Sequence, residues 1–260
     1  MPSLKSDTPK IYCWDLETGY NVVRLFQLFN KYINFNAIQQ ERYIICGSIK
    51  ELNKNTIQSV SLLDNASAFK KDPTNDRHVC VALRNLLKDA DALIGHNADN
   101  FDIKFLNTRM LFHGLPPLPP VVQIDTLKIA KHKFRFNSNR LDYIARLLGV
   151  GKKYKVTEEL WARCLGGDGA AVREMVKYNR VDVAILEKVY NKLSPYARTQ
   201  LNPNLWANGA VVCSNAACGG NNLTKHKNRI SLTRSYTQYQ CQDCGKYTSV
   251  TTANNSVIAK

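Results

Sequence analysis

Trp14-Asp15-Leu16-Glu17-Thr18 is the stretch that decides the fold, because it closes a short apolar run. An apolar run followed by Gly19 predicts a buried strand that ends in acidic residues. Asp15 and Glu17 are two residues apart, so their side chains point to one face of a strand while Leu16 points back into the core. Two carboxylates on one face can share a cation, although such pairs also occur at strand ends by chance.

Two further acidic clusters follow, one from Asn97 to Asp102 and one at Tyr178-x-x-x-Asp182. Asp102 stands where a helix is expected to begin, which suits a helix cap as well as a metal ligand. Tyr178 and Asp182 are four residues apart on an expected helix and therefore share one face. A tyrosine there is either a core or rim residue or a phenol that hydrogen-bonds an attacking water.

Together the three clusters supply four carboxylates, which repel one another unless cations lie among them. Two unit charges about 4 Å apart cost roughly 4 kcal/mol at an effective dielectric constant of about 20. The clusters therefore predict bound divalent metal, and metal held by carboxylates indicates phosphoryl chemistry. Asp125 and Asp142 lie in the same region and are better explained by helix capping and a surface position.

The order of the expected elements predicts an α/β fold with a mixed sheet flanked by helices, because strands come first and then alternate with helices. Expected strands cover residues 11–16, 43–50, 56–62, 92–95 and 121–125, with a hairpin turn at 53–55. Expected helices cover residues 79–88, 102–113, a segment from 126, a segment from 138 or 139 to 149, and 169–193.

The ordered set of motifs resembles the DEDD (DnaQ-like) 3′–5′ exonucleases of the RNase H-like superfamily over roughly residues 10–193. One branch of that family has a histidine five residues before the last aspartate, and the other has a tyrosine four residues before it. Lys177 and Tyr178 occupy these positions here, which matches the tyrosine branch. The matching strings are Trp14 to Thr18, Gly95-His96-Asn97, Phe101 to Leu106, Ile124 to Leu127, Ser138 to Ala145, Leu148-Gly149 and Tyr178 to Asp182.

The resemblance implies two Mg²⁺ or Mn²⁺ ions, with Asp15, Glu17 and Asp182 around one and Asp15 bridging to the second. Asp102 would support the second ion directly or through water, and Tyr178 would help to position the attacking water. Such a pair of ions stabilises both oxygens of an in-line displacement. Four further residues match positions that meet the terminal nucleotide in this family: Leu16, Thr18, Asn97 and Phe101.

Eight cysteines fall into two groups. The last four, Cys213, Cys218, Cys241 and Cys244, form two separated pairs, the usual arrangement of a tetrahedral zinc site. We predict one structural Zn²⁺ in a zinc ribbon, with a strand or hairpin over residues 230–240; a redox or disulfide function is the alternative. The scattered cysteines are expected to be buried free thiols: Cys13, Cys46, Cys80 and Cys164.

Cations and tyrosines alternate in the expected ribbon, a composition that suits phosphates and bases of a single strand. The cations proposed to bind substrate are Lys225, Lys227, Arg229 and Arg234. The alternatives are a solvated hairpin whose charges protect its edges, and a ribbon that docks a replication or repair protein.

The chain has 260 residues and a formal net charge of +15, which favours a nucleic-acid partner. No apolar run is long enough to span a membrane and no signal peptide is evident, so a cytoplasmic or nuclear location is expected. We expect an exonuclease domain at 1–194, a linker at 195–208 and a zinc-ribbon module at 209–260. The expected reaction is 3′–5′ hydrolysis of DNA, with RNA processing or a non-catalytic adaptor as rivals.

Overall fold

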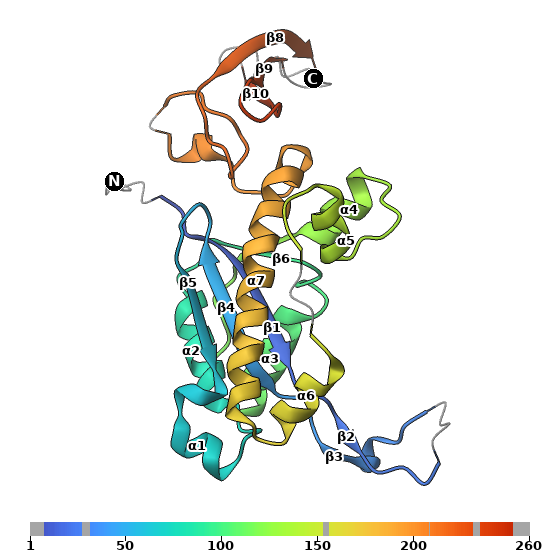
Figure 1. The fold of residues 1–260 in the computed structure, drawn as a ribbon. Helices are drawn as coiled ribbons and strands as arrows, with labels where there is room; N and C mark the ends of the chain where they lie inside the picture. The colour runs from blue at the N-terminus through green and yellow to red at the C-terminus, as the bar shows by residue number, and fades with distance from the viewer. Residues whose placement is uncertain (1–7, 28–31, 153–155, 208, 231–234, 252–260) are drawn as a thin grey trace, which may run out of the picture.

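The core of the protein is a five-stranded mixed sheet in the order β5-β4-β1-β6-β7. The computed structural model describes residues 8–27, 32–152, 156–207, 209–230 and 235–251 (Figure 1). β1 pairs with β4 and β4 with β5 in antiparallel fashion, whereas β1–β6 and β6–β7 are parallel. This confirms the predicted mixed sheet. The strands are β1 (Ile11–Thr18), β4 (Ile44–Glu51), β5 (Ile57–Ser61), β6 (Ala92–Gly95) and β7 (Val122–Asp125).

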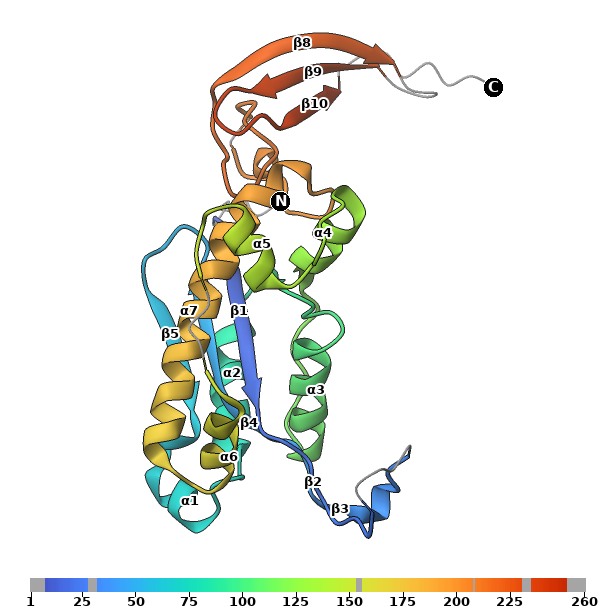
Figure 2. The same ribbon diagram turned by 45° about the vertical axis from the view of Figure 1, so that its right-hand side comes forward.

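Helices cover both faces of this sheet, as predicted (Figure 2). Trp14 and Leu16 of β1 pack into a cluster with α2 and α3, while Ile11 and Cys13 pack on the opposite face with α4, α5 and α7. The helices are α1 (Ala66–Lys71), α2 (Arg77–Leu87), α3 (Asp102–Phe112), α4 (Thr126–Lys133), α5 (Leu141–Leu147), α6 (Glu158–Leu165) and α7 (Gly169–Leu193). Four short 3₁₀ segments complete the described helical parts: η1 (Phe35–Ala37), η2 (Leu62–Asp64), η3 (Ser194–Tyr196) and η4 (Pro203–Leu205).

Most predicted elements are present with small shifts at their ends, and one helix begins later than expected. The hairpin turn after β4 has Asn53 in the left-handed region with φ 64°, where Asn is tolerated. Asp125 caps α4 by accepting from the backbone N–H of Leu127 at 2.9 Å, as predicted. α5 starts at Leu141 rather than at 138 or 139. The Asn139 carbonyl instead meets the His96 ring at 2.9 Å.

A two-stranded arm leaves the sheet between β1 and β4 and was not predicted from the sequence. Its strands are β2 (Val22–Val23) and β3 (Ile38–Gln40), which pair antiparallel with each other and not with the main sheet. The arm projects beyond the body of the molecule at the end of β1 (Figure 2). Helices α1 and α6 were also not predicted from the sequence.

The C-terminal part is a three-stranded antiparallel sheet in the order β10-β9-β8. Its strands are β8 (Leu223–Ile230), β9 (Ser235–Cys241) and β10 (Tyr247–Thr251). The strand or hairpin predicted over 230–240 corresponds to β9, whereas β8, which begins at Leu223, and β10 were not predicted. The β8 sequence lacks the alternation of apolar and polar residues that signals a half-buried strand, and its residues are almost all exposed.

Lys246 anchors the C-terminal sheet to the end of α7. Its ammonium donates to the carbonyls of Pro195 at 3.3 Å and Ala197 at 2.8 Å. Ala216 and Ala217 also pack against the core cluster that contains α7. In the part of the chain that the structure describes, no helix combines the length and apolar character needed to cross a bilayer.

Candidate active site and cysteine cluster

The structure brings three of the predicted acidic residues together. Asp15 and Glu17 come from β1 and Asp182 from α7, and each offers a carboxylate oxygen within 4.8 Å of the other two. Asp182 is buried, while Asp15 and Glu17 are partly exposed. Their two-residue spacing on the strand places both acids on one face, as the sequence indicated.

Asn179 fixes the orientation of Asp15 and was not singled out from the sequence. Its side-chain amide donates to Asp15 Oδ2 at 2.7 Å, and the residue is fully buried. Asn179 lies three residues before Asp182 on α7, so both point to the same side of the helix. That spacing is the signal that could have found it.

Asp102 lies beside the triad, at the first residue of α3. Its Oδ1 accepts from the backbone N–H of Leu16 at 3.1 Å, which ties the start of α3 to β1. Phe101 occupies the N-cap position, and no side-chain capping bond is present, so the capping alternative for Asp102 is wrong. Burial raises the pKa of Asp102 to about 6, against the opposing effect of the hydrogen bond from Leu16.

Tyr178 lies on the same helix as Asp182 and is partly buried. Its ring meets Trp161 of α6 edge-on, with ring centroids 6.1 Å apart. Trp161 also lines a pocket of about 820 Å³ that borders Glu17. The tyrosine is thus held at the edge of the acidic site by an aromatic contact.

The residues matched to the terminal nucleotide fall into two hollows. Leu16, Thr18 and Phe101 line the 820 Å³ pocket, although Leu16 and Thr18 are largely buried. Asn97 lines a second pocket of about 620 Å³, together with Asp15. Asn97 has a left-handed backbone with φ 68°, and its N–H donates to Asp125 Oδ1 at 2.8 Å.

Arg42 is a further pocket residue that sequence reasoning missed. Its guanidinium donates to Thr18 Oγ1 at 2.6 Å and to the Gly19 carbonyl at 3.3 Å. The same group lies 5.0 Å from the ring centroid of Phe101, within the range of a cation–π contact. Its position next to Glu41 and before an apolar strand gave no sign of this role.

Two further acids near the site form ion pairs. Asp142, assigned to the surface from the sequence, pairs with Arg146 one turn later on α5. Asp99 is only partly exposed and pairs with Lys128.

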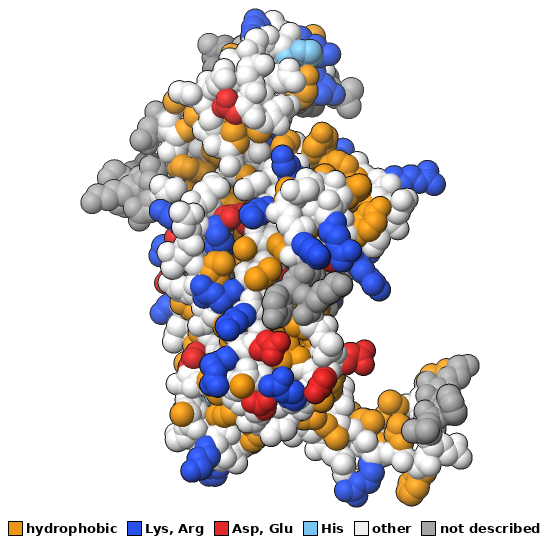
Figure 3. Space-filling model, in the orientation of Figure 1, with side chains coloured by type: hydrophobic (Ala, Val, Ile, Leu, Met, Phe, Trp, Pro, Cys, Tyr) orange, Lys and Arg blue, Asp and Glu red, His pale blue; other side chains and the backbone are white. Residues whose placement is uncertain are grey.

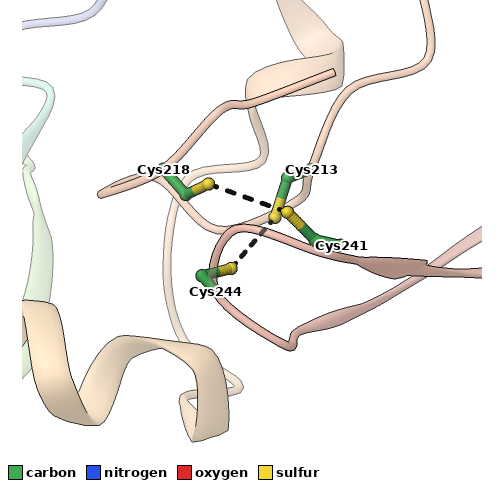
Figure 4. Close-up of side chains that lie close together, drawn as sticks. All are labelled: Cys213, Cys218, Cys241 and Cys244. Carbon is green, nitrogen blue, oxygen red and sulfur yellow. Dashed lines mark hydrogen bonds between the residues drawn. The ribbon is translucent and has the colours of Figure 1, made fainter. Parts of the chain in front are cut away.

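The four C-terminal cysteines converge from two turns (Figure 4). Their sulfurs all lie within 4.8 Å of one another. Cys213 and Cys244 are 3.5 Å apart and Cys218 and Cys241 are 3.8 Å apart, sulfur to sulfur. A zinc–sulfur bond of about 2.3 Å gives a tetrahedron with sulfurs roughly 3.8 Å apart. The cluster therefore fits a tetrahedral zinc site, and all four cysteines are free rather than disulfide-bonded.

The turns around the cysteines suit close approach of the chain. Gly219 and Gly245 have positive φ values of 58° and 76°, a conformation that glycine adopts without strain. Burial raises the pKa of Cys218 to about 11, while a backbone hydrogen bond from Gly220 opposes the shift. Zinc bound at this site would therefore displace the proton of the Cys218 thiol.

The predicted basic residues of the C-terminal sheet lie on both of its faces. Lys225 pairs with Tyr239 and Lys227 pairs with Gln238, because a bulge interrupts β8 between the two lysines. Cross-strand partners share a face and neighbours alternate, so Lys225 and Lys227 point in opposite directions. Arg229 pairs with Tyr236 on the face of Lys227. Arg234 lies outside the described residues.

The donor set at the acidic site fits hard divalent cations. Oxygen ligands are those that Mg²⁺ and Mn²⁺ prefer, whereas thiolates select zinc. The two clusters are therefore chemically distinct and would hold different metals.

This fold and this site define a class. The chain belongs to the RNase H superfamily, whose family model matches residues 41–194. Because the match begins after β1, it does not cover Asp15 or Glu17. Membership supports a nuclease type of activity.

The similar proteins are DNA polymerases, and the match covers one segment of each. The chain is 31% identical over 158 residues to DNA polymerase III PolC-type of Ureaplasma parvum, covering 58% of this chain and 10% of that protein. It is 27% identical over 153 residues to the PolC-type enzyme of Pediococcus pentosaceus, covering 56% of this chain and 10% of that one. The chain thus spans about a tenth of these relatives.

A solved structure shows the same fold. The family B DNA polymerase of Pyrobaculum calidifontis aligns with a TM-score of 0.55 at 15% identity, over 88% of this chain and 32% of that one. At this identity the likeness concerns the fold alone.

Proposed function

We propose that this protein is a metal-dependent 3′–5′ exonuclease that removes nucleotides from DNA, with single-stranded or frayed ends as its substrates. The convergence of Asp15, Glu17 and Asp182 within 4.8 Å carries the proposal. Carboxylates this close repel one another, and a bound cation relieves that repulsion. The similarity to segments of DNA polymerases favours DNA over RNA.

Each side chain of the acidic site has a separate proposed role in phosphodiester hydrolysis. Asp15, Glu17 and Asp182 would hold Mg²⁺ or Mn²⁺, and Asp102 would complete the acidic site. Divalent ions at such a site activate water and stabilise charge on the leaving oxygen. Asn179 keeps one oxygen of Asp15 oriented. Tyr178 would orient the attacking water through its phenol, because it stands one helical turn from Asp182.

The test is a time course on 3′- and 5′-labelled single-stranded DNA and RNA with Mg²⁺, Mn²⁺ or EDTA. We expect a metal-dependent ladder that shortens DNA from the 3′ end and that Asp182→Asn abolishes. Shortening of RNA alone would overturn the DNA assignment. Shortening from the 5′ end would overturn the polarity, and absence of any ladder would favour a non-catalytic adaptor.

We further propose that the cysteine cluster holds one structural zinc and that the C-terminal sheet binds the single-stranded substrate. Arg229 is the cross-strand neighbour of Tyr236 on one face of the sheet, and Lys225 is that of Tyr239 on the other face. A face that carries cations beside a ring suits the phosphates and bases of a single strand. Lys227→Ala with Arg229→Ala should weaken binding of DNA and reduce its salt dependence. Unchanged binding would favour the rival idea that the sheet docks a replication or repair protein.

A further inference from the structure

The described residues of the arm between β1 and β4, 19–27 and 32–42, contribute nothing to the hydrophobic core. None of its described residues belongs to either buried cluster, whereas Leu16 before it and Tyr43 after it do. Its large side chains face solvent instead: Phe26 is 108%, Tyr32 83% and Phe35 77% exposed. A gathering of large exposed apolar groups marks an interaction surface.

The described part of the arm is nevertheless an ordered element. β2 pairs with β3, and the N–H of Arg24 donates to the Ala37 carbonyl at 2.9 Å. Asn34 caps η1 by accepting from the N–H of Asn36 at 2.9 Å. Phe35, in η1, is therefore displayed from a defined turn.

Arg42 connects the base of the arm to the acidic site. Its backbone N–H donates to Asn21 Oδ1 at 2.9 Å, and its guanidinium reaches Thr18 and Gly19. Both ends of the arm are thereby held beside the strand that carries Asp15 and Glu17. Tyr20, Asn21 and Arg42 line the 820 Å³ pocket together with Glu17. The base of the arm therefore borders the pocket that includes Glu17.

The composition of the arm favours a nucleic-acid partner over an apolar protein surface. Residues 19–42 contain three Lys or Arg and one Glu. Figure 3 shows hydrophobic side chains gathered on the projecting arm next to a basic group. Exposed rings beside cations are what single-stranded nucleic acid requires, since bases stack on rings and phosphates pair with cations.

We propose that the arm is a stacking platform for unpaired bases of the substrate strand, close to the end that enters the acidic site. This inference rests on the proposed function. Phe26 and Phe35 are the rings that stack on the bases. Arg42 fixes the base of the arm beside the pocket.

Binding and hydrolysis are measured separately to test the platform. Binding of a fluorescent 12-mer of thymidylate and of an abasic 12-mer is followed by anisotropy in EDTA. Hydrolysis of the thymidylate 12-mer is followed in Mn²⁺. Phe26→Ala with Phe35→Ala should weaken binding of the thymidylate 12-mer by at least about tenfold, leave binding of the abasic 12-mer within about twofold, and raise KM more than it lowers kcat.

Asn36→Ala is the matched control, because it truncates an exposed side chain next to Phe35 without removing the Asn34 cap. It should behave like the wild type. Circular dichroism of both variants checks that the fold is retained. Equal losses on both 12-mers, or no loss on either, would overturn the platform.

Other outcomes remain distinguishable. A wild-type protein that binds and prefers the thymidylate 12-mer, but does not cleave it, leaves the platform standing and overturns the proposed exonuclease. A wild-type protein that binds neither 12-mer overturns the platform. Light scattering that shows a dimer lost on double substitution would also overturn it and assign the arm to self-association.

Discussion

The acidic site and the cysteine cluster both gather metal-ligating side chains, but the protein builds them in opposite ways. The acids extend from β1, α3 and α7, which pack into a large core. The cysteines lie in turns of a small sheet. Among its described residues, 209–230 and 235–251, the buried side chains are Cys213, Asn215, Cys241 and Thr248. Two of these belong to the cysteine cluster and two are polar, so the described residues of the small sheet form no apolar core of their own.

The two regions therefore differ in whether their folding depends on a bound metal. The main domain buries enough apolar surface to fold while holding carboxylates that repel one another. The cysteine module is below the size at which a core alone suffices, so the proposed zinc would supply its folding energy. Metal should therefore serve the reaction in one region and the fold in the other.

Cys241→Ser is expected to have the largest effect, because structural zinc contributes about 10–16 kcal/mol in comparable modules. We expect loss of bound zinc and rapid proteolysis of the C-terminal sheet, with the unfolding transition of the main domain retained. Zinc content and limited proteolysis measure this. Cys80→Ala, which removes a buried thiol of the main core, should keep one zinc per chain. A Cys241→Ser protein that keeps its zinc would break the comparison.

Asp15→Asn should affect the reaction and not the fold. We expect kcat to fall by at least about 10³-fold, roughly 4 kcal/mol of transition-state stabilisation. The free energy of unfolding without Mg²⁺ should not decrease, because a repelling charge is removed. Asp142→Asn is the control, since Asp142 lines the same pocket but pairs with Arg146. Retained turnover in Asp15→Asn would place the active site elsewhere.

The sequence predicted those features of the site that depend on the spacing of residues along one strand or helix. It did not predict those that depend on contacts between distant segments. The period-two pair Asp15 and Glu17 and the four-residue step from Tyr178 to Asp182 set their own faces, so the fold and the acidic cluster followed. The hydrogen bond of Asn179 to Asp15 joins residues 164 positions apart. The spacing of Asn179 from Asp182 indicates a shared helix face but not this partner. The arm was missed because its two strands are only two and three residues long.

Asp102 offers a pH-dependent test of how the main domain tolerates its buried acids. Burial raises its folded-state pKa from 3.8 to about 6. The folded state then binds more protons than the unfolded state between these values, so stability falls as pH rises through about 4 to 6. The shift corresponds to roughly 3 kcal/mol.

Denaturant unfolding across pH 4.5 to 7.5, without added Mg²⁺ or Mn²⁺, measures this dependence. Asp102→Asn should flatten the decrease between pH 4.5 and 6.5. An equal pH dependence in wild type and variant would show that Asp102 is not held at a raised pKa.

Substitution of Asn179 is expected to have the smallest effect on activity. It tests whether a buried hydrogen bond orients Asp15 for metal binding. Asn179→Ala removes the hydrogen bond to Asp15 Oδ2 but no proposed metal ligand. Residues that orient ligands typically change metal affinity or activity by about 10–100-fold. We expect a loss in that range and a higher Mn²⁺ concentration for half-maximal activity. Asn179→Asp should lose more, because it replaces a donor with a charge that repels Asp15. If the loss in Asn179→Ala is independent of Mn²⁺ concentration, the amide serves packing alone, and the carboxylates orient themselves on the metal as the thiols would.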